Sequence, residues 1–327
     1  MRRILNLFLL LVLSSCVTAQ VAETPTGTPI SIPTKVVPTN TALATTSIPT
    51  ITPTTEIACD PFRADYCITE GHFIFQRPIH PPANELLDET YLYGSTADGT
   101  REPHHGVEFP NQSGTPVYAA AEGTVLFAGA DNQAVYCPWP NFYGNLIVLK
   151  HNDGLFTLYA HLSKIDVETG QAVDTRTKIG EVGRTGVAIG SHLHFEVRQG
   201  DVEDYFATQD PQLWLLPAKD PPGQGGRFGV LVISVMDADH NLVKYAKYTI
   251  TASEKQSDEE VKSYYGITYP ADMLKEDTRS GPVDQNAVLG ELLIGRYRIA
   301  IERNGKVYAR WVEVESGKLT QVVFVVE

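Results

Sequence analysis

Short runs of alternating apolar and polar residues, separated by turns that contain glycine, fill the region from about residue 58 to residue 220. This pattern is typical of antiparallel β-strands, and no long helical period interrupts it. The runs expected to form strands are 115–119, 123–128, 145–150, 156–162, 178–182 and 193–197. We therefore predict a mainly β domain over residues 57–222.

A second β region follows a break in composition at residues 217–226, where prolines and glycines cluster as they do in linkers. Asn304-Gly305 is a typical hairpin turn in this region. The strand-like runs are 228–235, 242–251, 295–303, 306–314 and 319–326. We predict a small β-sandwich over 223–327, and we interpret the polar stretch 253–275 as helix and loop.

Residues 1–16 have the pattern of an export signal, because a basic start precedes an apolar run that is too short to span a bilayer. The run ends in Leu13-Ser14-Ser15-Cys16, which resembles the lipobox of bacterial lipoproteins. This resemblance implies that Cys16 is lipidated and that the exported chain is anchored to the membrane, facing the cell wall or periplasm. An ordinary signal peptide with an incidental cysteine is the alternative. We predict that residues 17–56, rich in threonine and proline, form a disordered linker.

Three further cysteines lie in a chain that is expected to reach a compartment where disulfides persist. We expect a disulfide between Cys59 and Cys67. Cys137 is then left over, either as a buried thiol or as a replacement for one member of that pair.

The chain is acidic, with a formal net charge of -13 at pH 7 and no basic stretch to offset it. Nucleic-acid binding depends largely on neutralising phosphates, so we exclude nucleic acid as a partner. The sequence also gives no indication of an oligomer.

The strand expected at 193–197 carries two histidines on one face. Alternation over residues 191–197 places His192, His194 and Glu196 together and puts apolar residues on the opposite side. Two imidazoles therefore project from one strand.

A third histidine is presented in a similar way, because alternation over 156–162 puts His161 beside Tyr159 on the face opposite the apolar core. Upstream, His104 and Glu108 share one face of an extended chain, since four residues is an even step. A catalytic zinc ion needs three protein ligands from such residue types and an open position for water. His104, Glu108 and one of the two histidines at 192 and 194 supply that set.

Three ordered motifs resemble those of the lysostaphin-like, LytM-type zinc metallopeptidases: His104-x-x-x-Glu108, Tyr159-Ala160-His161-Leu162-Ser163 and His192-Leu193-His194. The resemblance extends through the surrounding framework from about residue 73 to residue 198. It implies that His104, Glu108 and His194 bind one Zn²⁺ per chain and that His161 and His192 are catalytic. The family normally has Asp in place of Glu108, and the extra methylene moves the oxygen by about 1.5 Å, which a local backbone shift must absorb.

From this resemblance we predict a membrane-anchored zinc endopeptidase that hydrolyses peptide cross-links of bacterial peptidoglycan with a zinc-activated water. Its partners are then the stem or cross-link peptides of peptidoglycan. No H-E-x-x-H motif supplies a glutamate base, so an imidazole must handle the proton. The alternative is a catalytically inactive LytM-type module that binds cell wall or activates another wall hydrolase, and Glu108 is the residue that favours it.

Two other segments have patterns that bear on function. Residues 129–145 form an aromatic-bearing insertion that either walls a substrate groove or packs on itself as a surface loop. In the C-terminal region, Leu292-x-x-Gly295-x-Tyr297 resembles the transthyretin-like regulatory domains appended to carboxypeptidases.

Overall fold

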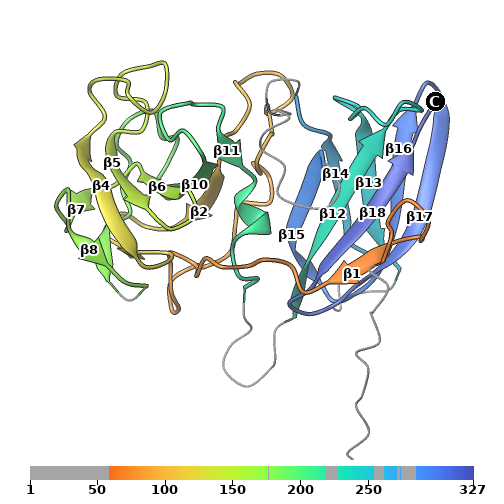
Figure 1. Ribbon diagram of the computed structural model, residues 1–327, viewed down its shortest axis with the longest axis horizontal. Helices are drawn as coiled ribbons and strands as arrows, with labels where there is room; N and C mark the ends of the chain where they lie inside the picture. Colours follow the sequence, from red (N-terminus) through yellow and green to blue (C-terminus); the bar gives the residue numbers. More distant parts are fainter. Residues whose placement is uncertain (1–58, 176, 219–226, 254–260, 271–272, 274–284) are drawn as a thin grey trace, which may run out of the picture. The chain divides into compact units, whose positions relative to one another are not determined.

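The structure of the protein, a computed structural model, describes residues 59–175, 177–218, 227–253, 261–270, 273 and 285–327. Apart from short 3₁₀ segments such as Pro211–Leu213 (η1), the regular structure of these residues is all strand, with no α-helix (Figure 1). Among the described residues there is accordingly no helix of the length and hydrophobicity needed to cross a membrane. The predicted signal peptide, the lipobox Cys16 and the linker 17–56 lie outside them.

A seven-stranded antiparallel sheet forms the centre of the first region. Its strands follow the order β11-β10-β6-β5-β4-β8, and β2 pairs with the first half of β10. Their bounds are Val107–Pro110 (β2), Gly123–Ala130 (β4), Asn145–Lys150 (β5), Leu155–Ala160 (β6), Ala172–Val173 (β8), His192–Gln199 (β10) and Thr208–Gln209 (β11). Pro116–Tyr118 (β3), Lys178–Glu181 (β9) and Lys164–Ile165 (β7) make a smaller antiparallel sheet. The mainly β, antiparallel fold class is confirmed.

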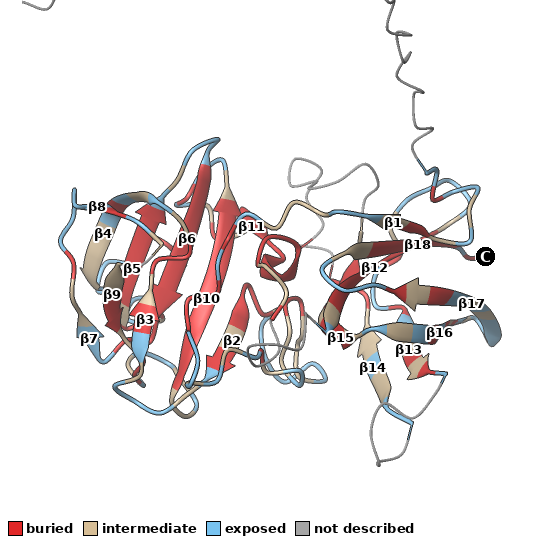
Figure 2. Cartoon of the chain, turned by 90° about the horizontal axis from the view of Figure 1, so that it is seen from below, coloured by how far each residue is buried: buried red, intermediate tan, exposed pale blue. Residues whose placement is uncertain are grey.

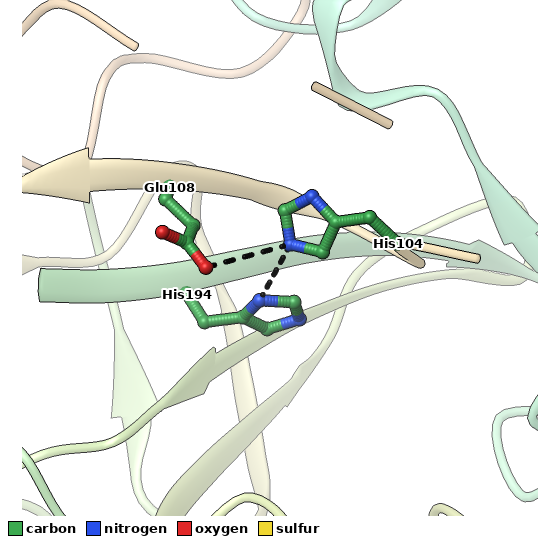
Figure 3. A group of neighbouring side chains, drawn as sticks. All are labelled: His104, Glu108 and His194. Atoms are coloured by element: carbon green, nitrogen blue, oxygen red, sulfur yellow. Dashed lines mark hydrogen bonds and ion pairs between the residues drawn. The ribbon is translucent and has the colours of Figure 1, made fainter. Parts of the chain in front are cut away.

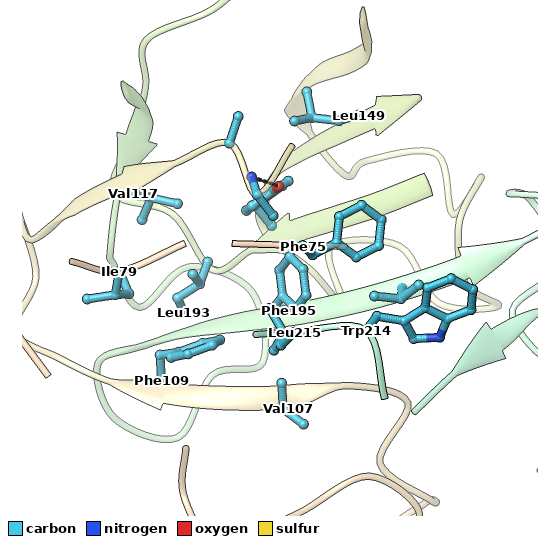
Figure 4. Packing of buried hydrophobic residues seen from close by; sticks show 14 of the residues in the cluster. Phe75, Ile79, Val107, Phe109, Val117, Leu149, Leu193, Phe195, Trp214 and Leu215 are labelled. Atoms are coloured by element: carbon cyan, nitrogen blue, oxygen red, sulfur yellow. Dashed lines mark hydrogen bonds between the residues drawn. The ribbon is translucent and has the colours of Figure 1, made fainter. Parts of the chain in front are cut away.

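The central sheet is covered on both faces, so β6 is buried along its whole length and β10 along all but its last residue (Figure 2). One face packs into a core that contains Leu193, Phe195 and Phe109 (Figure 4). The other face packs against a second core that contains Leu158 and Ala160. Strand alternation therefore sorts residues between two cores rather than between core and solvent.

This double burial corrects one expectation for β6. Tyr159 was expected on the face away from the core, but it is fully buried in the first core and stacks edge-on against Phe195 at 5.3 Å. Its hydroxyl accepts a hydrogen bond from Thr157 Oγ1 at 3.0 Å and one from the Ala120 backbone N–H at 2.8 Å. The prediction was wrong because it assumed that only one face of the sheet is covered.

The C-terminal region is a sandwich of two four-stranded sheets, as predicted. One sheet has the order β1-β18-β12-β15 and the other β14-β13-β16-β17, with a shared apolar core between them. The bounds are Cys67–Thr69 (β1), Phe228–Met236 (β12), Lys247–Ala252 (β13), Ser263–Ile267 (β14), Ala287–Leu293 (β15), Gly295–Arg303 (β16), Lys306–Val314 (β17) and Leu319–Val325 (β18). Part of the stretch interpreted as helix and loop is thus strand β14, and β15 was not predicted.

Strand β1 comes from the start of the described chain, yet it pairs antiparallel with β18 in the C-terminal sandwich. Cys59 and Cys67 are joined by a disulfide, so this loop is attached to that sandwich. Residues 67–69 were assigned to the first domain on sequence, where their long-range pairing is invisible. Cys137 is a free, buried thiol whose sulfur donates to the Trp139 carbonyl oxygen at 3.0 Å.

Candidate metal centre and active site

Three potential metal ligands converge where β2 meets β10. The register of this pair places Glu108 directly beside His194, and His104 precedes β2. His104 Nε2 lies 3.2 Å from His194 Nδ1 and 3.8 Å from Glu108 Oε1 (Figure 3). The ligand atoms of the three residues all lie within 4.8 Å of one another. The longer side chain of Glu108 therefore reaches the two imidazoles.

Hydrogen bonds on the far side of each ring fix which nitrogens carry protons. His104 Nδ1 donates to the Tyr91 carbonyl oxygen at 2.9 Å, and the His104 ring stacks on the Tyr91 ring at 4.1 Å. His194 Nε2 donates to Glu196 Oε1 at 3.0 Å. His104 Nε2 and His194 Nδ1 therefore face each other as lone pairs, an arrangement that a bound cation stabilises. The residues present fit a zinc site.

A buried ionic network supports His194 from behind. Glu196 and Arg198 are fully buried, and Arg198 donates through Nε and Nη2 to Glu196 Oε2 at 2.9 and 2.7 Å. The Tyr143 hydroxyl donates to Glu196 Oε1 at 2.6 Å. Burial alone would raise the pKa of the Glu196 carboxyl, but Arg198, His194 and Tyr143 together hold it below its usual value. Glu196 is therefore an anionic acceptor for His194.

Sequence reasoning placed Glu196 on the face of His192 and His194 but gave it no role. Its position two residues after His194 on the same strand face was the available signal. Its partner Arg198, two residues further along the same strand face, could be found in the same way, but Tyr143 could not, because it comes from a distant loop.

His161 and His192 lie beside the cluster. Their ring centroids are 4.9 Å apart, and the His161 ring is 5.6 Å from that of His194. His161 follows the last residue of β6 and has a φ of 61°, a left-handed conformation that leaves the strand geometry. His161 therefore reaches the site through a backbone turn and not through the alternation that was expected to present it. Its Nδ1 donates to the Thr185 carbonyl oxygen at 2.9 Å.

Burial keeps His104, His161 and His192 neutral. Burial, followed by the nearby His194, lowers the pKa of His104 well below its usual value. The same two causes lower the pKa of His161 to about 3 and that of His192 to about 4, with His192 also acting on His161. Burial raises the pKa of Glu108. At neutral pH these imidazoles hold lone pairs that can bind a metal or accept a proton.

The cluster lines a cavity of about 280 Å³. Val187 and Ile189, which are 57% and 72% exposed, form an apolar wall, and Arg101 lines the cavity beside Tyr91. His105 also lines it, but this ring packs on Tyr205 with centroids 3.9 Å apart, and His105 is not part of the cluster of His104, Glu108 and His194.

The insertion 129–145 contributes a residue to the cavity and packs on the central sheet rather than on itself alone. Tyr136, Cys137 and Tyr143 are buried in the second core together with residues of β5 and β6. Phe142 lines the cavity, as a wall residue would.

Comparison with known proteins places this site in a recognised domain. The model of "Peptidase family M23" matches residues 102–205, a span that contains the five site residues. The chain is 39% identical over 95 residues to the peptidoglycan DD-endopeptidase ShyA of Vibrio cholerae, a match that covers 29% of this chain and 20% of that protein. It is 36% identical over 129 residues to the uncharacterized lipoprotein YgeR of Escherichia coli, covering 39% and 44%.

Among solved structures, a zinc-containing peptidase from Vibrio cholerae is 32% identical with a TM-score of 0.33, covering 40% of each chain. The chain thus spans less than half the length of each of these proteins. Residues 102–205 therefore match peptidase family M23, and relatives of the chain are named peptidoglycan endopeptidases.

Proposed function

We propose that this protein is a membrane-anchored zinc endopeptidase that hydrolyses the peptide cross-links of peptidoglycan. One observation carries the proposal: the four motif histidines, His104, His161, His192 and His194, gather with Glu108 in one cavity within the residues that match family M23. Relatives of that domain are named peptidoglycan DD-endopeptidases, which supports the stem or cross-link peptides as substrate.

In this proposal His104, Glu108 and His194 would hold one zinc ion beside the cavity. When bound, zinc supplies a water of lowered pKa and polarises the scissile carbonyl group. The hydrogen bonds from His104 to Tyr91 and from His194 to Glu196 aim the two lone pairs at the metal position. Glu108 contributes the anionic ligand.

We assign proton handling to His161 and His192. Because His161 donates through Nδ1 to Thr185, its Nε2 holds a lone pair on the cavity side. His192 Nε2 is buried and, among the described residues, has no hydrogen-bond partner; it lies 3.4 Å from Glu108 Oε1. Two neutral imidazoles beside the cluster fit the transfer of a proton from the attacking water to the leaving amine.

We also propose that the chain is exported and anchored through Cys16. The lipobox pattern supports this, and one relative is named a lipoprotein. A disulfide between Cys59 and Cys67 fits a chain that folds outside the reducing cytosol. In this arrangement the linker 17–56 separates the anchor from the enzyme. We divide the rest of the chain into the peptidase domain 57–222 and the accessory sandwich 223–327.

The test uses residues 57–327 on purified cell-wall sacculi. We expect new peptide amines to appear with zinc, to disappear after chelation and to return when zinc is restored. A preparation that binds sacculi and zinc but releases no amines would identify the inactive wall-binding module instead.

A further inference from the structure

Glu291 is a buried carboxylate in an unusual backbone position in the C-terminal sandwich. It lies in β15 where the register against β12 shifts, and it is 5% exposed. Its φ is 59°, in the left-handed region that a non-glycine residue adopts only at a cost. Such strain persists where surrounding contacts hold it, and it gathers at functional positions.

The side chain of Glu291 contacts residues outside the C-terminal sandwich, Leu87 and Arg77. Both its oxygens accept from the backbone N–H of Leu87, at 3.0 and 3.3 Å. It also forms an ion pair with Arg77, whose side chain is buried. Replacing Glu291 by an apolar residue would leave a buried guanidinium without its counter-ion and a buried amide without its acceptor.

Leu87 begins segment 87–94, which is bonded to two of the candidate zinc ligands. The Asp88 N–H donates to the Glu108 carbonyl oxygen at 2.9 Å. The Tyr91 carbonyl oxygen accepts from His104 Nδ1, and the Gly94 N–H donates to the His104 carbonyl oxygen at 2.8 Å. The position and tautomer of His104 therefore depend on where this segment lies.

The far end of segment 87–94 is held by a second residue of the C-terminal region, Tyr269. Its ring packs edge-on against Tyr93 at 5.3 Å and lies so close to Gly94 that a Cβ there would be 2.5 Å from the ring. The Tyr269 hydroxyl donates to Asp210 Oδ2 at 2.5 Å, which fixes the ring in place.

We propose that the C-terminal sandwich positions the candidate metal ligand His104 through segment 87–94, with Glu291 as the positioning residue. Glu291 fixes the start of the segment and Tyr269 fixes its end, so that the Tyr91 carbonyl meets His104 Nδ1. The lone pair on His104 Nε2 is thereby aimed at Glu108 and His194. The inference rests on the proposed function for the identity of the metal.

The test compares metal binding in Glu291→Ala, Glu291→Gln and Lys262→Met forms of residues 57–327. Lys262 is the matched control, because it pairs with Glu89 of the same segment but both side chains are nearly half exposed. Zinc affinity is measured by competition with a chromophoric chelator, and the visible spectrum of the cobalt-substituted protein reports ligand geometry. All measurements are made where circular dichroism shows a folded chain.

We expect Glu291→Ala to weaken zinc binding by about 10- to 100-fold and to shift the cobalt spectrum. Glu291→Gln should recover part of the affinity, because its amide oxygen still accepts from Leu87, and Lys262→Met should match the wild type. If Glu291→Ala does not fold, Glu291→Asp, which draws the carboxylate back by one methylene, takes its place.

Wild-type affinity and spectrum in the folded Glu291 variants would overturn the inference. A wild-type protein that binds zinc normally but cuts no sacculi would overturn the proposed function alone, so the two failures are distinguishable.

Discussion

His104 Nε2 and His194 Nδ1 lie 3.2 Å apart with their lone pairs facing each other. The other nitrogen of each ring carries the proton: His104 Nδ1 donates to the Tyr91 carbonyl oxygen, and His194 Nε2 donates to Glu196. Without a cation this contact is repulsive, and in the proposed function the two nitrogens and Glu108 would together bind one zinc ion. The buried partners behind the rings are therefore as much part of the site as the ligands.

The first prediction concerns Glu196. We expect Glu196→Gln to lower zinc affinity about tenfold or more, because His194 loses the anionic acceptor that fixes its tautomer. The same change leaves Arg198 buried without its counter-ion and should lower the free energy of unfolding by about 3–5 kcal/mol. Chelator competition and urea unfolding measure the two effects. Tyr143→Phe, which keeps the Glu196 carboxylate, should lower zinc affinity and the free energy of unfolding by less. Unchanged zinc affinity in Glu196→Gln would show that this network does not orient His194.

A second prediction separates ligand from proton carrier. His161→Ala should keep its zinc and lose about 10²- to 10⁴-fold in turnover, because a neutral imidazole beside the cluster is removed. His104→Ala should lose zinc and activity together. Metal analysis and the amine-release assay on the same preparations measure this, with the exposed His80→Ala as a control that changes neither. Loss of zinc from His161→Ala would make this residue a ligand.

A third prediction addresses the carboxylate that departs from the family pattern. The Glu108 carboxylate lies within 4.8 Å of the ligand nitrogens of His104 and His194, and Glu108→Asp would draw it back by one methylene, so this change should weaken zinc binding even though Asp is the usual family residue. Glu108→Ala should weaken it further. Titration calorimetry with zinc measures both variants. Tighter binding by Glu108→Asp than by the wild type would mean that Glu108 is misplaced as a ligand.

A fourth prediction concerns pH and Asp210. Burial raises the pKa of Asp210 to about 6, although hydrogen bonds from Tyr269 and Gln212 oppose the shift. In the unfolded chain the Asp210 carboxyl ionises near pH 4, whereas in the folded protein it stays protonated until about pH 6. Ionisation between these two pH values therefore favours the unfolded chain, and the free energy of unfolding of the wild type falls by up to about 3 kcal/mol as the pH rises through this range. Asp210→Asn should remove that loss.

The melting temperature of Asp210→Asn relative to the wild type should therefore rise between pH 4 and pH 7. The exposed Asp239→Asn serves as the control and should show no such trend. A difference between Asp210→Asn and the wild type that does not change with pH would contradict the raised pKa.

Local sequence pattern was sufficient for the part of the site built on one strand pair. The side-chain period of two in β10 placed His192, His194 and Glu196 on one face, and the even step from His104 to Glu108 brought these two side chains together. These relationships depend on neighbouring residues alone, which is why they could be predicted.

The rest of the site depends on contacts between distant residues. Because β6 is buried on both faces, Tyr159 lies in the core. His161 lies at the cavity because its backbone has a left-handed conformation. The pairing of β1 with β18 and the bond from Leu87 to Glu291 join segments that are more than two hundred residues apart. No local pattern encodes such contacts.

The most direct test of the central claim is the mass of the products formed from a purified cross-linked muropeptide dimer. With zinc, residues 57–327 should convert the dimer into two monomers whose summed mass exceeds that of the dimer by one water, and Glu108→Ala or chelation should prevent this. A dimer that is bound by the zinc-loaded protein but recovered intact would contradict the assignment of this site as a peptidase.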